Sequence, residues 1–131
     1  MQTTMQIEIN TLDPVPIYEQ VRNRVVLAIA SGQILPGDKL PSARKLAADL
    51  GINFHTVNKS YGVLENEGYV IMDRRKGAVV AEKAESVEAE AHKKSLKEKL
   101  YMAAAESVCH NVSLEEFVSL CVAQYKKAAK K

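Results

Sequence analysis

The pattern of apolar and polar residues in the first half of the chain predicts three helices. The first covers residues 16–31, with Pro16 in its first turn, where a missing N–H is tolerated. A second begins after Ser42, a favourable N-cap, and stops at Gly51, and a third covers residues 54–67. Their predicted buried faces are Ile17, Val21, Val25, Ala28 and Ile29, then Leu46, Ala47 and Leu50, then Val57, Tyr61 and Leu64.

Other segments alternate with a period of two, which is typical of strands with one buried face. Met5, Ile7 and Ile9 predict a short strand near the N-terminus. Residues 69–72 and 78–81 predict a hairpin, whose tight turn over residues 73–77 is basic. Gly77 supplies a positive φ if that turn needs one.

Residues 82–131 have a different composition, rich in Ala, Glu and Lys, which favours helices. One helix is predicted to about Val108, and another begins at Ser113, whose spacing to Glu116 matches a capping box. The predicted apolar stripes are Leu96, Leu100, Ala103, Ala104 and Val108, then Leu114, Phe117, Val118, Cys121 and Tyr125.

Two helices joined by a short Gly-containing turn, followed by a hairpin with a basic tip, are the pattern of a winged helix-turn-helix. The predicted fold is therefore mainly α with a small β-hairpin wing. We expect a DNA-binding domain over residues 1–81 and a two-helix dimerisation region over residues 82–131.

Residues on the outer face of the third helix are the candidates for contact with DNA, because a helix fits the major groove of B-DNA. Asn58 can pair with adenine, Lys59 can reach a guanine or a phosphate, and His55 can donate or accept a hydrogen bond. Phe54 flanks the buried stripe, so it either packs against the core or touches a thymine methyl. Gly62 either admits a close approach of backbone or is a loosely packed surface position.

Cations near this helix extend the candidate surface. Arg44, in the first turn of the second helix beside Ser42, opposes the helix dipole unless a phosphate or a guanine edge lies nearby. Arg74, Arg75 and Lys76 form the tip of the hairpin, next to Gly77. Such a run is usually a solvated turn, but in a wing it would meet the flanking minor groove or its phosphates.

Bulk properties constrain function less than these patterns do. The net charge is only +2, and residues 1–80 and 81–131 each hold nine basic and eight acidic residues, so only the local placement of charge can indicate DNA. No apolar run could span a bilayer and residues 1–10 lack a signal-peptide pattern, so we expect a cytoplasmic protein with no membrane partner.

Several motifs resemble those of the GntR family of bacterial transcriptional regulators. The segment over residues 35–47 carries the resemblance, together with residues 50–53, 56–57, 64–68 and 76–77. The match covers roughly residues 10–81, and residues 16–21 with the short helical tail resemble the YtrA-like subfamily.

This resemblance implies a dimeric regulator, often a repressor, that binds a near-palindromic operator and commonly controls a transporter operon. Family DNA contacts map onto Arg44, the start of the third helix, Lys76 and Gly77, and Thr56 matches a threonine that touches phosphate. Many members carry arginine where Phe54 and Asn58 stand here, so guanine readout cannot be carried over to those positions.

Only about fifty residues follow the predicted wing, too few to enclose a ligand pocket within one subunit. A lone helix pair also has too little core to stand alone. We therefore expect the tail to form a homodimer interface, although its apolar residues could instead pack onto their own subunit; an effector is unknown, and a site between subunits stays open. The predicted interface residues are Leu96, Leu100, Phe117, Val118 and Tyr125.

Two alternative functions stay open from the sequence alone. One is a winged-helix module that binds proteins instead of DNA, which an exposed Phe54 would favour. The other is a metal- or redox-responsive regulator using Cys109, Cys121 and nearby histidines, although their spacing matches no zinc pattern. We expect no cofactor and no metal, and the absence of phosphate-loop, nucleophile or paired-carboxylate motifs argues against an enzyme.

Overall fold

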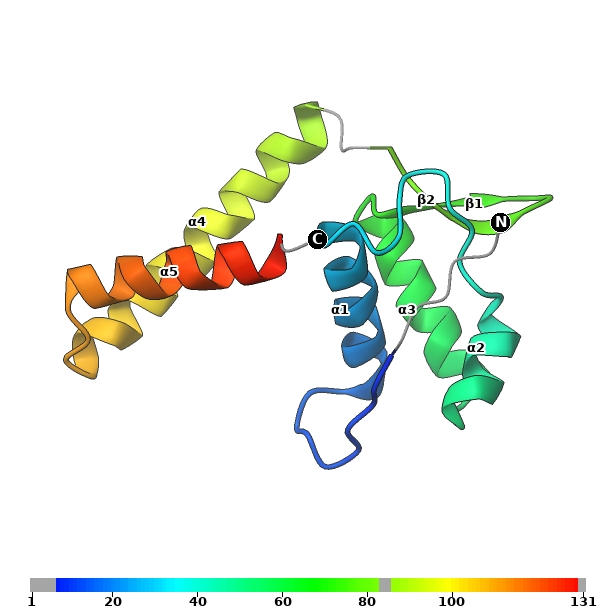
Figure 1. Cartoon of the computed structure of the whole chain (residues 1–131), viewed down its shortest axis with the longest axis horizontal. Helices are drawn as coiled ribbons and strands as arrows, with labels where there is room; N and C mark the ends of the chain where they lie inside the picture. Colours follow the sequence, from blue (N-terminus) through cyan, green and yellow to red (C-terminus); the bar gives the residue numbers. More distant parts are fainter. Residues whose placement is uncertain (1–6, 83–85, 130–131) are drawn as a thin grey trace. The chain divides into compact units, whose positions relative to one another are not determined.

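The computed structural model describes residues 7–82 and 86–129. These residues form two compact units, which we call the head (residues 7–82) and the tail (residues 86–129). Within them lie five helices and one two-stranded antiparallel hairpin (Figure 1). The predicted fold class, a mainly helical winged helix-turn-helix followed by two further helices, is confirmed.

The three head helices are α1 (Ile17–Ala30), α2 (Ala43–Leu50) and α3 (Phe54–Asn66). Capping explains where α2 and α3 begin. The Ser42 hydroxyl accepts a hydrogen bond from the Lys45 N–H at 3.1 Å, and the Asn53 side chain accepts one from the His55 N–H at 2.7 Å. Gly51 then ends α2 with a left-handed φ of 67°, which glycine adopts without strain.

The head has one continuous apolar core, because α1 and α2 both pack against α3. Each predicted helix face contributes to it, and the wing and the segment before α2 complete it. Partly buried residues around it include Ile17, Phe54 and Tyr69. The fully buried apolar residues are Val21, Val25, Ala28, Ile34, Leu40, Leu46, Ala47, Val57, Tyr61, Leu64, Val70, Ala78 and Val80.

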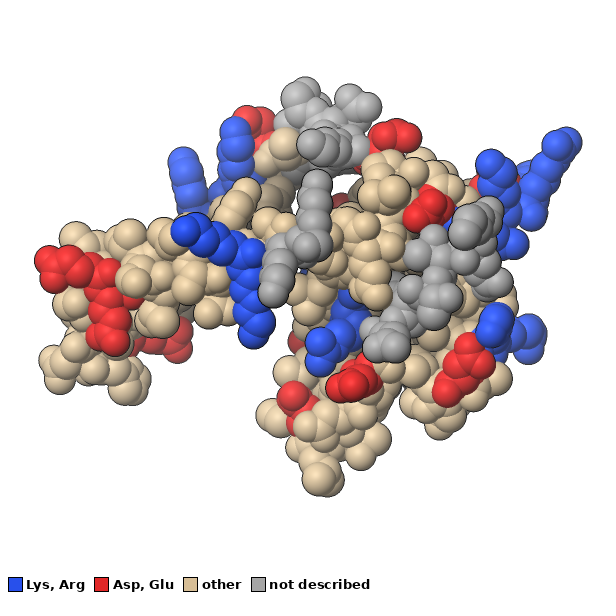
Figure 2. All heavy atoms as spheres, in the orientation of Figure 1, with Lys and Arg blue, Asp and Glu red and all other residues tan. Residues whose placement is uncertain are grey.

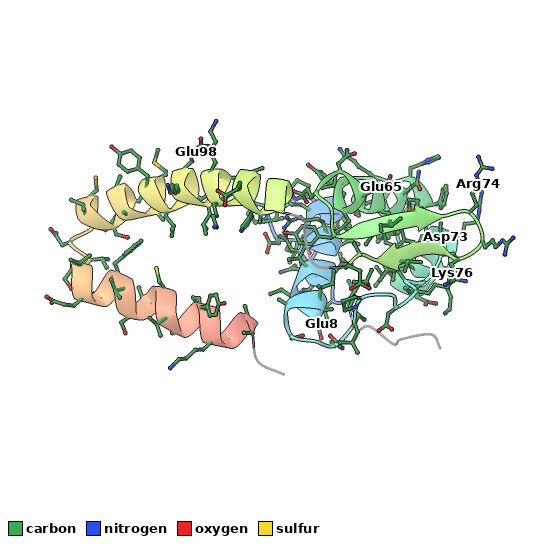
Figure 3. The ribbon with its side chains drawn as sticks, turned by 90° about the horizontal axis from the view of Figure 1, so that it is seen from above. Glu8, Glu65, Asp73, Arg74, Lys76 and Glu98 are labelled. Atoms are coloured by element: carbon green, nitrogen blue, oxygen red, sulfur yellow. The ribbon has the colours of Figure 1, made fainter. Side chains whose placement is uncertain are left out.

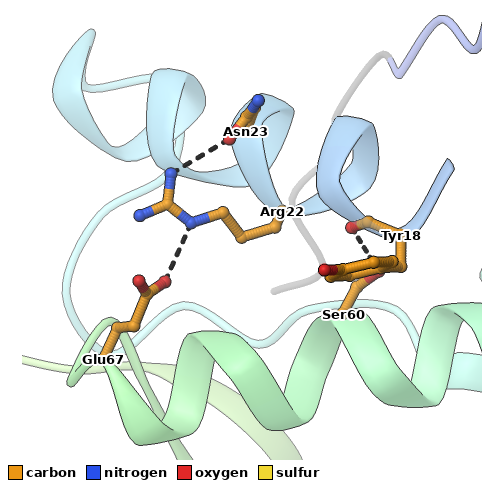
Figure 4. A network of polar contacts seen from close by, with 5 residues as sticks. All are labelled: Tyr18, Arg22, Asn23, Ser60 and Glu67. Carbon is orange, nitrogen blue, oxygen red and sulfur yellow. Dashed lines mark hydrogen bonds and ion pairs between the residues drawn. The ribbon is translucent and has the colours of Figure 1, made fainter. Parts of the chain in front are cut away.

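Polar contacts fix the middle and the end of α3 against α1 (Figure 4). In the middle of α3, the buried Ser60 hydroxyl lies 2.7 Å from the Tyr18 carbonyl of α1 and 3.1 Å from the Thr56 carbonyl. At its end, the Arg22 side chain donates a hydrogen bond of 2.8 Å to the Glu67 carboxylate. Helix α3 therefore has a fixed orientation against α1.

The wing consists of β1 (Val70–Asp73) and β2 (Gly77–Val80), paired antiparallel from Val70 opposite Val80 to Asp73 opposite Gly77. Residues 37–40 pair with the other edge of β2. The Gly37 N–H donates to the Val80 carbonyl at 2.8 Å, and the Leu40 N–H donates to the Ala78 carbonyl at 2.9 Å. The wing is therefore joined to the segment that leads directly into α2.

The predicted N-terminal strand is wrong for the residues that are described, since residues 7–10 form no strand; Met5 lies outside the described residues. Ile7 and Ile9 do pack against the core, as their alternation predicts. The backbone of Asn10 is satisfied differently: its N–H and its carbonyl both bond to the Gln20 side chain, each at 2.9 Å. This side chain replaces the strand partner that a ladder would require.

The tail contains α4 (Ser86–Cys109) and α5 (Leu114–Ala128), which turns back along α4 (Figures 1 and 3). Asn111 has a φ of 62° in the intervening turn, and Ser113 caps α5 by accepting a hydrogen bond from the Glu116 N–H at 3.1 Å. Over residues 89–129, no side chain is fully buried. Within the described parts of the chain, no helix has the length and apolar character needed to cross a membrane.

Candidate nucleic-acid interface

The outer face of α3 carries exposed polar side chains. His55, Asn58 and Lys59 are exposed, whereas Val57, Tyr61 and Leu64 on the opposite face are buried. This arrangement follows from the helical spacing of the two sets of residues. Because the core holds the apolar face, the polar face is presented to solvent as a fixed surface.

The first turn of α2 adds Arg44 to this surface. Arg44 is exposed, and its guanidinium carbon lies 4.5 Å from the centre of the Phe54 ring. The first turns of α2 and α3 contain no acidic residue. Since helix N-termini carry a partial positive charge, both termini and Arg44 favour an anionic ligand.

Phe54 is half-buried and packs against the core, and one side of its ring meets Arg44. The centre of the His55 ring lies 5.5 Å from that of Phe54, at an interplanar angle of 60°. The sequence leaves two roles open for Phe54, packing against the core or contact with a thymine methyl. Its partial burial favours packing. The sequence gives no sign of the contact with Arg44, because the two residues lie on different helices.

Lys59 has an aromatic neighbour of its own. Its ammonium nitrogen lies 4.0 Å from the centre of the half-buried Tyr18 ring, on α1. A cation over an aromatic face is attracted by the ring quadrupole. The sequence did not predict that Tyr18 contacts a candidate site residue. The only signal for such a contact is its position next to Ile17, the first residue of the apolar face of α1.

The wing tip carries three exposed cations, Arg74, Arg75 and Lys76. Arg74 and Lys76 project from the hairpin turn (Figure 3), and basic side chains gather at that end of the wing (Figure 2). The Asp73 carboxylate shapes the turn by accepting hydrogen bonds from the N–H groups of Lys76 at 3.0 Å and Arg75 at 2.7 Å. These bonds hold the pKa of Asp73 below its usual value, because they favour the ionised carboxylate.

The remaining predicted site residues surround these cations. Ser42 is exposed but its oxygen caps α2, Thr56 is half-buried, and Gly77 is exposed with a φ of 80°. A Cβ built on Gly62 would meet nothing within 4 Å, so no neighbouring residue in the chain requires a glycine there. The structure thus brings the start of α2, the outer face of α3 and the wing together in one unit.

The cysteines do not belong to this surface. Cys109 ends α4 and Cys121 lies on α5, and both are exposed free thiols. In the described ranges, no group of three or more His, Cys, Asp or Glu side chains is arranged to hold a metal ion.

A two-helix motif that presents a polar helix beside a basic hairpin defines a winged-helix, DNA-binding class of protein. The family model for bacterial regulatory proteins of the gntR family matches residues 17–80. The transcriptional repressor YtrA of Bacillus subtilis is 34% identical over 110 residues, which are 84% of this chain and 85% of YtrA. The chain belongs to the GntR family and is of the YtrA-like type.

Three further comparisons agree with this assignment. The HTH-type regulator YhcF of Bacillus subtilis is 38% identical over 73 residues, although the match spans only 60% of YhcF. A transcriptional antiterminator from Listeria monocytogenes has a similar structure, with a TM-score of 0.89 and 26% identity, covering 99% of this chain and 96% of that one. A crystal structure of AraR(DBD) in complex with the operator ORX1 matches with a TM-score of 0.53 and 29% identity over 60% of this chain and 100% of its own.

The family and its relatives are transcriptional regulators and not enzymes. The chain is accordingly a DNA-binding transcription regulator, as the sequence predicts.

Proposed function

We propose that this chain is a homodimeric repressor that binds a near-palindromic operator in the cytoplasm. The observation that carries the proposal is the exposed polar face of α3 next to Arg44 and the basic wing tip. The similarity to AraR(DBD), whose structure contains an operator, and to the repressor YtrA supports it. The further proposal that the operator controls a transporter operon rests on the resemblance to YtrA-like regulators alone.

In the proposed complex α3 enters the major groove. Asn58 pairs with an adenine edge, while His55 and Lys59 reach base edges or phosphates. Arg44 donates to a guanine edge or a phosphate, and Ser42 and Thr56 lie close to the backbone. Phe54 lies at the rim of this contact. The wing residues Arg75, Lys76 and Gly77 meet the flanking minor groove or its phosphates.

The tail supplies the proposed dimer interface. Several of its large apolar side chains are exposed, 42% for Leu100, 49% for Val118 and 78% for Tyr125, and no residue over 89–129 is fully buried. Burying such surface against a second copy of the same tail would remove it from water. The residues proposed to form the interface are Leu96, Leu100, Phe117, Val118 and Tyr125.

Selection of DNA from a random duplex library by the full chain, followed by footprinting, tests the proposal. A symmetric footprint with half-sites one helical turn apart, or a multiple of it, is expected from a two-fold dimer. A protein-binding module would instead enrich no sequence. The affinity for the selected duplex must also fall steeply with salt, because phosphate contacts release counterions.

Arg44→Ala gives the sharpest test at one residue. We expect it to weaken binding to the selected duplex by about 1–3 kcal/mol if the side chain contacts a base. Arg24→Ala is the matched control, since it removes the same charge from an exposed position on α1. Equal affinities of the wild-type protein and Arg44→Ala would remove Arg44 from the interface.

A further inference from the structure

Arg44 and Phe54 form a contact between two helices that lies inside the proposed DNA interface. Arg44 lies in the first turn of α2 and Phe54 is the first residue of α3. The turn over residues 51–53 brings them together, so that the guanidinium carbon lies 4.5 Å from the ring centre. The contact therefore exists in the protein without DNA.

The ring is held in place more firmly than the arginine. Phe54 is half-buried against the head core, and His55 contacts it from one side. An aromatic side chain has only two rotatable bonds, so a packed ring is a rigid support. Arg44, by contrast, is exposed and has a long flexible side chain whose orientation in solvent would otherwise vary.

A ring supports a cation without neutralising it. The neighbouring Lys45 is paired with the Asp49 carboxylate at 3.1 Å, and that pairing offsets its charge. Among the ion pairs found in the described residues, none includes Arg44. Because a phenyl ring offers no lone pair and no charge, the guanidinium keeps its full charge and its N–H donors for another ligand.

We infer that Phe54 is a positioning residue for Arg44: its ring holds the guanidinium in the orientation that reads the operator, and does not itself contact DNA. The inference rests on the proposed function, because it assigns the role of one residue within that interface. It predicts that the Phe54 ring increases the affinity for the operator only through its effect on Arg44.

The test compares wild-type protein, Phe54→Leu, Phe54→Tyr, Arg44→Ala and the double variant Phe54→Leu/Arg44→Ala. Two probes are used, a duplex selected from a random library by the wild-type protein and a scrambled duplex of the same length. Phe54→Leu is expected to weaken binding to the selected duplex about two- to fivefold, the range for an exposed cation–π contact. Phe54→Tyr keeps the ring and is expected to restore wild-type affinity.

Two readouts separate positioning from a structural role. Phe54→Leu keeps the charge of Arg44, so the salt dependence and the binding of the scrambled duplex are expected to stay unchanged. In the Arg44→Ala background, Phe54→Leu is expected to have no further effect. A loss of the same size in that background, or unchanged affinity of Phe54→Leu alone, would overturn the inference.

An independent measurement uses the protein without DNA. The side-chain N–H proton of Arg44 is expected to show a ring-current shift in the NMR spectra of the wild type and Phe54→Tyr, and no such shift in Phe54→Leu. An unshifted Arg44 signal in the wild type would contradict the inference even if Phe54→Leu folds poorly. Failure of the proposed function looks different, since the wild-type protein would then enrich no duplex at all.

Discussion

The head and the tail differ in how completely they bury their own apolar side chains. The head encloses its own core, where Val21, Val57 and Leu64 are fully buried. In the tail, α4 and α5 leave large side chains such as Tyr125 in solvent, and no residue over 89–129 is fully buried. The head therefore has a core of its own, whereas the proposed homodimer would give the apolar side chains of the tail a second surface on which to be buried.

The largest expected effect comes from the head core. Leu64→Ala leaves a cavity where α3 packs, so we expect a loss of about 2–5 kcal/mol in the free energy of unfolding. Urea unfolding followed by circular dichroism measures the loss, and it should not depend on protein concentration. Leu114→Ala, an exposed position on α5, serves as the control. A concentration-dependent loss in Leu64→Ala would contradict the self-sufficient head.

A substitution in the tail should act on the monomer–dimer equilibrium, in contrast to the substitution in the head core. Leu100→Asp places a charge on the apolar face, and we expect dimer dissociation to become about 10- to 100-fold easier, equal to about 1.4–2.8 kcal/mol. Analytical ultracentrifugation over a range of concentrations measures it. Lys99→Asp is the matched control at the neighbouring exposed position. A monomeric wild-type protein, or an unchanged dimer in Leu100→Asp, would contradict the proposed interface.

A smaller effect is expected at the surface of the head, where no core is disturbed. Lys76→Ala should weaken binding to every duplex alike, by up to about 1 kcal/mol, and lower the salt slope by about one. Fluorescence anisotropy at several salt concentrations separates the two quantities. If only the selected duplex were affected, Lys76 would contact a base and not a phosphate.

The smallest expected effect concerns the shape of the wing turn. The pKa of Asp73 is lowered by the N–H groups of Lys76 and Arg75, so the ionised carboxylate stabilises the turn above the usual pKa of an aspartate. That contribution is lost as the pH falls through the lowered pKa of the folded protein. Hydrogen exchange of the Arg75 and Lys76 amides should then quicken relative to that of Val80. Asp73→Asn, which keeps the acceptor, should remove most of this pH dependence.

Most of the fold of the head could be predicted from short-range signals. Ser42, Asn53 and Gly51 mark helix boundaries because capping depends on residues within one turn. The strand predicted near Ile7 and Ile9 was wrong because a period of two indicates burial on one side and not a ladder partner. The pairing of residues 37–40 with β2 was missed, since a segment rich in turn residues gives no such signal.

The exposed residues of the candidate site could be predicted from the sequence, but the residues that contact and position them could not. Helical spacing alone separates Asn58 and Lys59 from the buried face. Tyr18 lies 41 positions before Lys59, and Arg44 lies on a different helix from Phe54, so the ring contacts depend on tertiary packing. The burial of Ser60 was missed for the same reason. A serine is expected at the surface, and the sequence does not show that its hydroxyl bonds to the Tyr18 carbonyl on another helix.

The pairing of β2 with residues 37–40 has a geometric consequence for target choice. That segment ends one residue before Pro41, whose carbonyl accepts a hydrogen bond of 2.7 Å from the Tyr61 hydroxyl. Hydrogen bonds thus connect the wing, the entry to α2 and the middle of α3. The distance between the wing and α3, the two elements proposed to contact a half-site, is therefore fixed. We expect a half-site lengthened by one base pair to be rejected, even when every contacted base is kept.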